Sequence, residues 1–289
     1  MSWVAVKFFP LTPTFLRLFS AICFAGAIAL IWNIARRHST VFIASIATGA
    51  AFLLSESFLT LAKDARFYGI SLLRIAWAAK TYDRLYSGDR PSLVLLISNT
   101  FAHSLAVCTS YVAGMFSFAI LVSFAVCDQF RNERRPLVYL SVVAAWIPLL
   151  FCIPFIFTHS DATSWMSKPG LSMIYHPFSG GIDVGSGYFI IIGFALLFVL
   201  RLFVPQLHQE PIQEPKQANH LYFLAFVILM VPYGIFVLSR LGMPMLIDRY
   251  AMPPLIAYAF LITFILNTVE ITEDSSIKPR WFATTRSVI

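Results

Sequence analysis

Residues 41–54 read VFIASIATGAAFLL, without a charged side chain, and a charged motif follows at 63–68, Lys63-Asp64-Ala65-Arg66-Phe67-Tyr68. Residues 69–79 are again apolar and hold one charge, Arg74. Apolar runs of this kind are typical of helices that cross a bilayer. Because ionisable side chains at membrane depth are costly and usually face a cavity or pair with one another, we interpret the motif as a candidate functional element.

The composition is that of an integral membrane protein. The chain has 289 residues, of which 58% are hydrophobic and 12% charged, and its mean hydropathy is +0.77. A soluble domain has about 25% charged residues, roughly twice this fraction. The apolar residues form blocks of about 20, the length of a membrane-crossing helix, without the alternation of a β-barrel. We therefore predict an all-α fold, a polytopic bundle of transmembrane helices.

The net charge of +7 and the absence of several common enzyme motifs argue against some classes of function. An excess of Lys and Arg in a membrane protein is typical of cytoplasmic loops, so we do not expect nucleic acid as a partner. The sequence has no Walker loop and no GxGxxG, GxSxG or HExxH motif, which argues against ATP-driven transport and serine hydrolysis.

We predict about nine membrane segments in one domain. They run over residues 14–35, 41–60, 68–84, 92–107, 110–127, 137–157, 186–204, 220–239 and 251–268. Polar side chains interrupt the third and fourth segments, so each is also compatible with a partial or tilted helix. The transmembrane domain covers residues 1–269, and residues 270–289 are predicted to form a polar, disordered tail.

The distribution of Lys and Arg predicts the orientation through the positive-inside rule. Every second gap between segments is rich in them, and these gaps are placed in the cytoplasm: Arg36 and Arg37; Lys80, Arg84 and Arg90; Arg131, Arg134 and Arg135; Lys216; and Lys278, Arg280 and Arg286. The motif at 63–68, the loop at 158–185 and a second motif at 248–250 then face outward. We expect a multi-pass protein of the cell (inner) membrane with a cytoplasmic C-terminus.

The same orientation places residues 1–13 outside, with no export helix before them. They also lack the basic start and apolar stretch of a signal peptide. We therefore expect that a leading membrane segment and its outer loop are missing from this chain.

The first motif has groups suited to proton and phosphate chemistry. Glu56 precedes Asp64 by eight residues, so a continuous helix would put both carboxylates on roughly one side. A carboxylate at an apolar interface is desolvated, which favours its protonated form and suits it to proton transfer. The planar guanidinium of Arg66 matches phosphate oxygens. The alternative is an Asp64–Arg66 pair that only anchors the end of a helix.

The second motif, Asp248-Arg249-Tyr250, stands before the last segment and its start Ala251-Met252-Pro253-Pro254. Proline is tolerated in the first turn of a helix because its missing N–H would be unpaired there. The helix N-terminus carries a partial positive charge beside Arg249, which favours an anion such as a lipid phosphate. The alternative is anchoring at the membrane interface by Arg249 and Tyr250.

Histidines provide further candidates. His103 lies in a polar patch, residues 99–104, near the predicted outer end of its segment. A single histidine is more often part of hydrogen-bonded structure than a ligand. The loop at 158–185 holds residues able to bind a metal, but without the spacing of a known metal site, so we expect no metal: His159, Asp161, His176 and Asp183.

Three stretches resemble motifs of a known family in their order along the chain. Residues 15–21, Phe-Leu-Arg-Leu-Phe-Ser-Ala, and the helix that ends in Ala35-Arg36-Arg37 are similar to a family helix with the pattern "lRLpSal…llarr". Residues 55–68 resemble an outer loop with "sqeARmYal", and Arg249-Tyr250 with its prolines resembles "RYllPalP". Residues 101–104 are loosely similar to "yTHy". The family is that of the GT-C glycosyltransferases, in the family-39 branch of protein mannosyltransferases and aminoarabinose transferases.

This resemblance implies an enzyme that takes a sugar from a polyprenyl-phosphate donor and passes it to an acceptor hydroxyl at the outer (periplasmic or lumenal) face. It implies that Arg66 and Arg249 hold the donor phosphate, with Tyr68, His103 and Tyr250 as further substrate-binding residues. The acceptor would be a glycan, a lipid or a protein, with membrane lipids as the other partners and no cofactor beyond the donor. The family places its main acid in a first outer loop, and residues 1–13 hold no Asp or Glu, so Asp64 is the candidate base here.

Two other functions stay open at this point. A transporter or flippase-like protein would have internal repeats or broken helices at the bilayer midplane, and the sequence shows no repeat. A non-catalytic relative, either a pseudoenzyme or an accessory subunit, is compatible with the departure at the first acidic loop.

Overall fold

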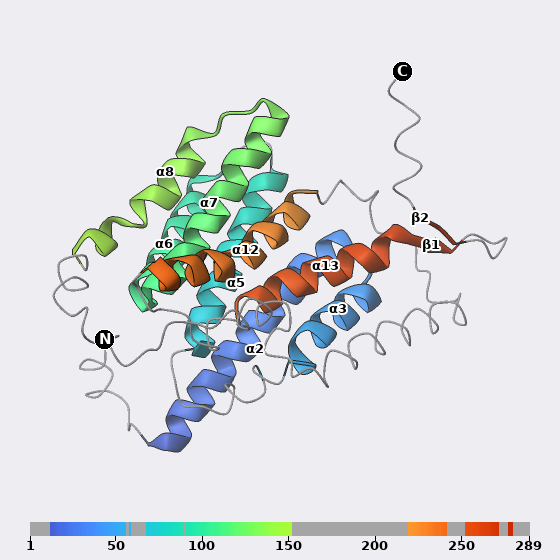
Figure 1. Cartoon of the computed structure of the whole chain (residues 1–289), viewed down its shortest axis with the longest axis horizontal. Coiled ribbons are helices and arrows are strands. Elements are labelled where there is room, and N and C mark those ends of the chain that lie inside the picture. Colours follow the sequence, from blue (N-terminus) through green and yellow to red (C-terminus); the bar gives the residue numbers. More distant parts are fainter. Residues whose placement is uncertain are drawn as a thin grey trace.

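The computed structural model describes residues 12–55, 58, 68–88, 91–151, 219–241, 252–271 and 277–279 (Figure 1). These ranges are helical apart from two three-residue strands, which confirms the prediction of a helical fold. The labelled helices are α2 (Pro13–His38), α3 (Val41–Leu53), α5 (Tyr68–Ser87), α6 (Leu93–Thr109), α7 (Tyr111–Arg131), α8 (Pro136–Ala144), α12 (Asn219–Leu241) and α13 (Pro254–Thr268). The strands are β1 (Val269–Ile271) and β2 (Ile277–Pro279).

Three of these helices, α2, α7 and α12, are long and apolar enough to cross a membrane. Their 26, 21 and 23 residues rise about 39, 32 and 35 Å, against a hydrocarbon core of about 30 Å. A helix also lies in every other predicted segment except 186–204, which falls outside the described residues. The fold is therefore compatible with a membrane protein.

Two helices end earlier than predicted. Helix α3 stops at Leu53, within the predicted segment 41–60, because Ser55 Oγ accepts a hydrogen bond from the backbone N–H of Phe58 at 3.2 Å. This is the contact of a helix N-cap, and it begins a new turn instead of extending α3. Helix α8 stops at Ala144, where the backbone bonds change to the shorter i→i+3 type before a second helical stretch at 147–151. The remaining ends of both segments lie outside the described residues.

Helix α5 is central to the bundle and packs against α2, α6, α7 and α12. It runs parallel to α2, and the two helices approach closely where Gly69 meets Ser20. A Cβ added to Gly69 would lie 2.6 Å from the backbone oxygen of Ser20, so this approach requires glycine. On one side of the bundle α6 and α7 pack against α8, and on the other α13 packs against α3 (Figure 1).

The helices give the bundle two distinct ends. At the first, α2, α5 and α7 finish, and α6, α8 and α12 begin; Asp83 of α5 there bonds His38 of α2 and His220 of α12. We call this the basic end, since Arg36, Arg37, Arg84, Arg131, Arg134 and Arg135 lie in the terminal turns and connections there. At the opposite end, α5, α7 and α13 begin, and we call it the Tyr68 end.

The prediction of a disordered tail from residue 270 is wrong at its start. Strand β1 pairs with β2 in antiparallel register, with Ile271 opposite Ile277 and Glu270 opposite Lys278. The register thus places two β-branched residues opposite one another and an acidic residue opposite a basic one, and pairings of these residue types favour a short hairpin. Residues 280–289 lie outside the described part of the chain.

Candidate functional site

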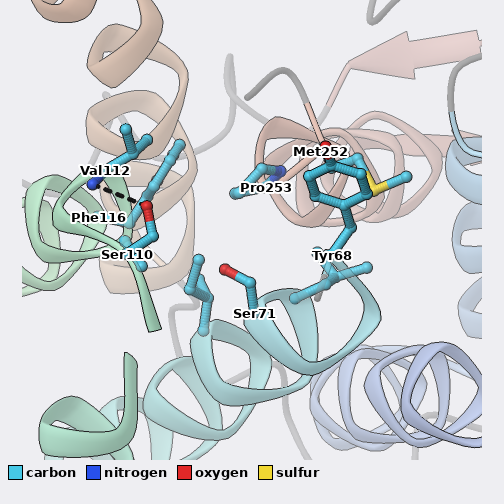
Figure 2. Close-up of a pocket in the computed structure, with 10 residues that line it drawn as sticks. Tyr68, Ser71, Ser110, Val112, Phe116, Met252 and Pro253 are labelled. Atoms are coloured by element: carbon cyan, nitrogen blue, oxygen red, sulfur yellow. Dashed lines mark hydrogen bonds between the residues drawn. The ribbon is translucent and has the colours of Figure 1, made fainter. Parts of the chain in front are cut away.

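Three chain segments line a small cavity at the Tyr68 end (Figure 2). Tyr68 and Ser71 belong to the first turn of α5, Ser110 precedes α7, and Met252 and Pro253 precede α13. The cavity has about 20 Å³ of room, enough for roughly one water molecule. Its remaining wall is apolar and consists of Leu72, Ile75, Val112, Ala113 and Phe116.

Two hydroxyl groups give this cavity a polar side. Ser110 Oγ accepts a hydrogen bond from the backbone N–H of Val112 at 3.2 Å and caps α7. Its own hydrogen therefore remains as a donor. Ser71 carries the second hydroxyl, which points toward the same space (Figure 2). Hydroxyl groups on one side of a cavity this small can hydrogen-bond a water molecule.

The cavity joins Tyr68, the described end of the first charged motif, to Met252 and Pro253, which closely follow the second motif. Tyr68, a predicted substrate-binding residue, is buried and lines it. Arg66 precedes Tyr68 by two residues, and Arg249 precedes Met252 by three. Sequence separation between the motifs is large, yet their adjoining residues share one cavity. The predicted residues Asp64, Arg66, Arg249 and Tyr250, together with Glu56, lie outside the described residues.

His103, the other predicted substrate-binding residue within the described part of the chain, is fully buried in the bundle and does not line this cavity. Its Nδ1 lies 2.7 Å from Ser117 Oγ, and Ser117 also accepts a hydrogen bond from Trp146 Nε1 at 2.9 Å. The other ring nitrogen, Nε2, is buried and has no hydrogen-bond partner among the described residues. The structure thus shows His103 as a link between α6, α7 and the stretch after α8.

Arg74 is a buried cation within α5. Its Nη1 donates to the backbone oxygen of Leu105 at 2.7 Å and to the hydroxyl of Thr109. Thr109 is the last residue of α6 and Leu105 lies one turn before it, at the end of the helix where the dipole favours a positive charge. These two contacts tie α5 to the end of α6.

At the basic end, the carboxylate of Asp83 is fully buried and joins three other side chains. Oδ1 accepts hydrogen bonds from His38 Nε2 at 2.7 Å and His220 Nε2 at 3.2 Å. Oδ2 forms an ion pair with Arg37, whose side chain is 39% exposed. A buried carboxylate is stable only when paired and hydrogen-bonded, and here α2 and α12 both contribute partners to α5.

The same cluster has the composition of a metal site. One ligand atom each from His38, Asp83 and His220 lies within 4.8 Å of the others. A bound metal would need the ring proton on Nδ1 of each histidine, with an acceptor nearby. Nδ1 of His220 is buried, and no described residue offers it a hydrogen bond. The hydrogen bonding therefore favours imidazoles that donate Nε2–H to Asp83 over imidazoles that ligate a metal.

A second buried carboxylate, Asp128, lies at the same end on α7. Arg135 Nε donates to its two oxygens at 3.1 and 3.2 Å, and Tyr139 donates to Oδ2 at 2.6 Å. Arg135 also donates to the backbone oxygen of Leu85 at 2.8 Å. Burial alone would lower the pKa of Arg135, but its bonds to Asp128 raise that pKa above the ordinary value. The cluster fixes the α7–α8 connection against the end of α5.

Sequence patterns alone place Arg37 and Arg135 among the loop charges and do not single out Asp83 or Asp128. The partners of these residues lie far away in the sequence, as with the 137 positions between Asp83 and His220. The signal that could have found them is an acidic residue inside an otherwise apolar helix, which needs a buried partner.

Comparisons of the chain with protein-family models, with curated proteins and with solved structures gave no match. The resemblance to GT-C glycosyltransferases stays a prediction.

Proposed function

We propose that this chain is a multi-pass membrane glycosyltransferase of the GT-C type, with about nine membrane segments. It would move a sugar from a polyprenyl-phosphate donor to an acceptor hydroxyl at the Tyr68 end of the bundle. The observation that carries the proposal is the cavity shared by Tyr68, Met252 and Pro253. Two motifs that resemble separate parts of the family's active site adjoin this one cavity, as a common site requires.

The charge distribution supports an outward-facing Tyr68 end. Lys and Arg gather at the basic end, and the positive-inside rule assigns that end to the cytoplasm of a cell (inner) membrane protein. Asn267, near the end of α13, donates to the backbone oxygen of His38 at 3.0 Å. The last helix thus finishes at the basic end, which supports a cytoplasmic C-terminus.

Chain connectivity supports the predicted segment at 186–204. Leu149 lines one cavity with Val107 and Gly114, which are close to where α6 ends and α7 begins at the Tyr68 end. His220, by contrast, is at the basic end with Asp83. The described residues that flank this gap, up to 151 and from 219, thus lie toward opposite ends of the bundle, as the predicted segment at 186–204 requires.

In the proposed reaction, the acceptor hydroxyl gives its proton to Asp64 while its oxygen attacks the anomeric carbon of the donor sugar. The bond from that carbon to the lipid phosphate breaks, with inversion, and the phosphate leaves with the electron pair. Arg66 and Arg249 hold the phosphate and offset its charge, since guanidinium groups match phosphate oxygens. Tyr68 and Tyr250 border the sugar, whereas His103, buried away from the cavity, would have a structural role between α6 and α7.

The test is sugar transfer by the purified protein in liposomes, with polyprenyl-phosphate mannose and polyprenyl-phosphate aminoarabinose as donors. Loss of a general base lowers a rate by about 10²–10⁴-fold, so Asp64→Asn should lose nearly all transfer. Arg66→Gln and Arg249→Gln should each lower it by about tenfold or more, the cost of one or more charge-assisted hydrogen bonds. Arg17→Gln is the matched control, since Arg17 is exposed near the start of α2 at the same end.

Transfer that is insensitive to Asp64, Arg66 and Arg249 would contradict the proposed site. Donor binding without transfer by the unmodified chain would instead identify a non-catalytic relative. Protein that elutes normally on size exclusion but neither binds nor transfers either donor would contradict the proposed function.

A further inference from the structure

A crevice on the outer side of α5 gathers positive charge near the basic end. It lies between α2 and α6, encloses about 210 Å³, and is lined by Leu30, Trp77, Lys80, Thr81, Arg84, Leu95 and Ser98. Residues 77, 80, 81 and 84 are spaced by three and four, so they share one face of α5. The volume is below the roughly 300–1,000 Å³ of pockets for drug-sized ligands and suits a small head group.

None of the described residues that line the crevice carries a carboxylate. Lys80 and Arg84 are one helical turn apart, an arrangement of like charges that is unfavourable without an anion. The acidic residue on the same helix, Asp83, is turned inward and is bonded to Arg37, His38 and His220. Neither oxygen of Asp83 therefore neutralises the charge of Lys80 or Arg84.

A hydroxyl donor faces the same space. Ser98 Oγ accepts a hydrogen bond from Trp77 Nε1 at 3.1 Å, which leaves its own hydrogen to donate. Thr81, by contrast, has its single hydroxyl hydrogen shared between the side-chain oxygen of Asn99 at 2.7 Å and the backbone oxygen of Ala78 at 2.9 Å. An ammonium, a guanidinium and a hydroxyl thus converge, and all three are donors to a phosphate oxygen.

The rest of the lining is apolar and points to a lipid. Leu30, Leu95 and the ring of Trp77 form the wall beside the charges. Lys80 lies seven residues before the end of α5, about 10 Å along the helix axis from Ser87. A cationic group at this depth beside apolar walls is at the level of lipid head groups, where basic pockets between helices bind anionic lipids.

We propose that this crevice binds the phosphate group of an anionic phospholipid at the basic end of the bundle. Lys80 and Arg84 hold the phosphate oxygens, Ser98 donates to one of them, and the acyl chains lie along Leu30 and Leu95. The site is separate from the sugar-transfer site at the Tyr68 end and does not depend on that proposed function.

The test counts lipids bound to the detergent-purified protein by native mass spectrometry, with phosphatidylglycerol and phosphatidylcholine titrated in parallel. We expect one tightly bound phosphatidylglycerol that phosphatidylcholine does not replace. In Lys80→Gln/Arg84→Gln the affinity for this lipid should fall about tenfold or more, since two charge-assisted bonds are lost. Arg36→Gln/Arg134→Gln removes the same charge at the same end outside the crevice and should leave the affinity unchanged.

Two further arms of the experiment distinguish a lipid site from a site for soluble phosphates and from general charge attraction. Glycerol phosphate at millimolar concentration should not displace the bound lipid, because it lacks the acyl chains, and displacement by it would overturn the proposal. Lys80→Arg/Arg84→Lys keeps the charges and should keep the lipid, whereas loss of the lipid from this variant would show that charge at these positions does not hold it. Equal loss in the Arg36→Gln/Arg134→Gln control would show general charge attraction, which also overturns the proposal.

Discussion

Asp83 and His220 are hydrogen-bonded at 3.2 Å although 137 positions of sequence separate them. The bond joins the last turns of α5 to the first turn of α12, so it fixes where the chain returns to the bundle. Tyr86, one turn further along α5, stacks on the same imidazole with ring centroids 4.2 Å apart. The buried carboxylate of Asp83 thus holds the ends of α2, α5 and α12 together, through hydrogen bonds from two histidines and an ion pair with Arg37.

Replacing Asp83 with Asn should destabilise the protein strongly. The amide has no charge to pair with Arg37, and its NH₂ group cannot accept a hydrogen bond. Removing one partner of a buried pair costs about 3–5 kcal/mol, and we expect the lower end because Arg37 is partly exposed and can turn to water. Thermal unfolding in detergent measures the change.

Glu133→Gln is the matched control for that variant. Glu133 also faces an arginine, Arg135, but at 3.7 Å and with its side chain 49% exposed. Exposed pairs contribute about 0–1 kcal/mol, so the melting temperature should hardly move. Similar melting temperatures for the two variants would show that burial of Asp83 does not determine how much this residue contributes to stability.

Replacing Arg135 with Lys should lower stability although the charge is kept. The guanidinium reaches Asp128 and the backbone oxygen of Leu85 at once, and a single ammonium cannot reproduce that fork. Loss of one such bond to a charged group costs about 1.5–3 kcal/mol. Arg134→Lys, at an exposed neighbour, should have no effect on unfolding by the same measurement. An Arg135→Lys protein as stable as the original would mean that only the charge matters.

Substitution by alanine should have opposite effects on stability at two glycines, Gly69 and Gly49. In Gly69→Ala the new Cβ would lie 2.6 Å from the backbone oxygen of Ser20, so α2 and α5 must move apart. Overpacking of this kind costs about 1–3 kcal/mol. In Gly49→Ala the new Cβ would have no described atom within 4 Å apart from its chain neighbours and the backbone of its own helix, and the helix should gain about 0.5–1 kcal/mol. Unfolding of the two variants in parallel checks the contrast, and a destabilised Gly49→Ala protein would contradict it.

The sequence predicts the helices well because apolar length determines them, as in α2, α7 and α12. It misses the end of α3 because a local hydrogen bond from Phe58 to Ser55 competes with helix continuation. It identifies Tyr68 but not the cavity, since the approach of Met252 to Tyr68 depends on how α5 and α13 pack. The Asp83 cluster is missed for the same reason, because tertiary packing alone brings its members together.

Replacing Arg74 with Met should leave stability within about 1 kcal/mol of the original, in contrast to the Asp83 variant. Arg74 is a buried cation whose described partners are a carbonyl and a hydroxyl. Both partners are uncharged, so replacing Arg74 leaves neither of them with an uncompensated charge. The backbone oxygen of Leu105 stays satisfied, because Thr109 also donates to it at 2.6 Å. Methionine fills similar space with a flexible apolar chain. Unfolding in detergent tests this, and a loss of stability as large as that of Asp83→Asn would contradict the expectation. An unchanged melting temperature would mean that a costly buried charge adds little to the fold, which is the behaviour expected of an intramembrane residue with a functional role.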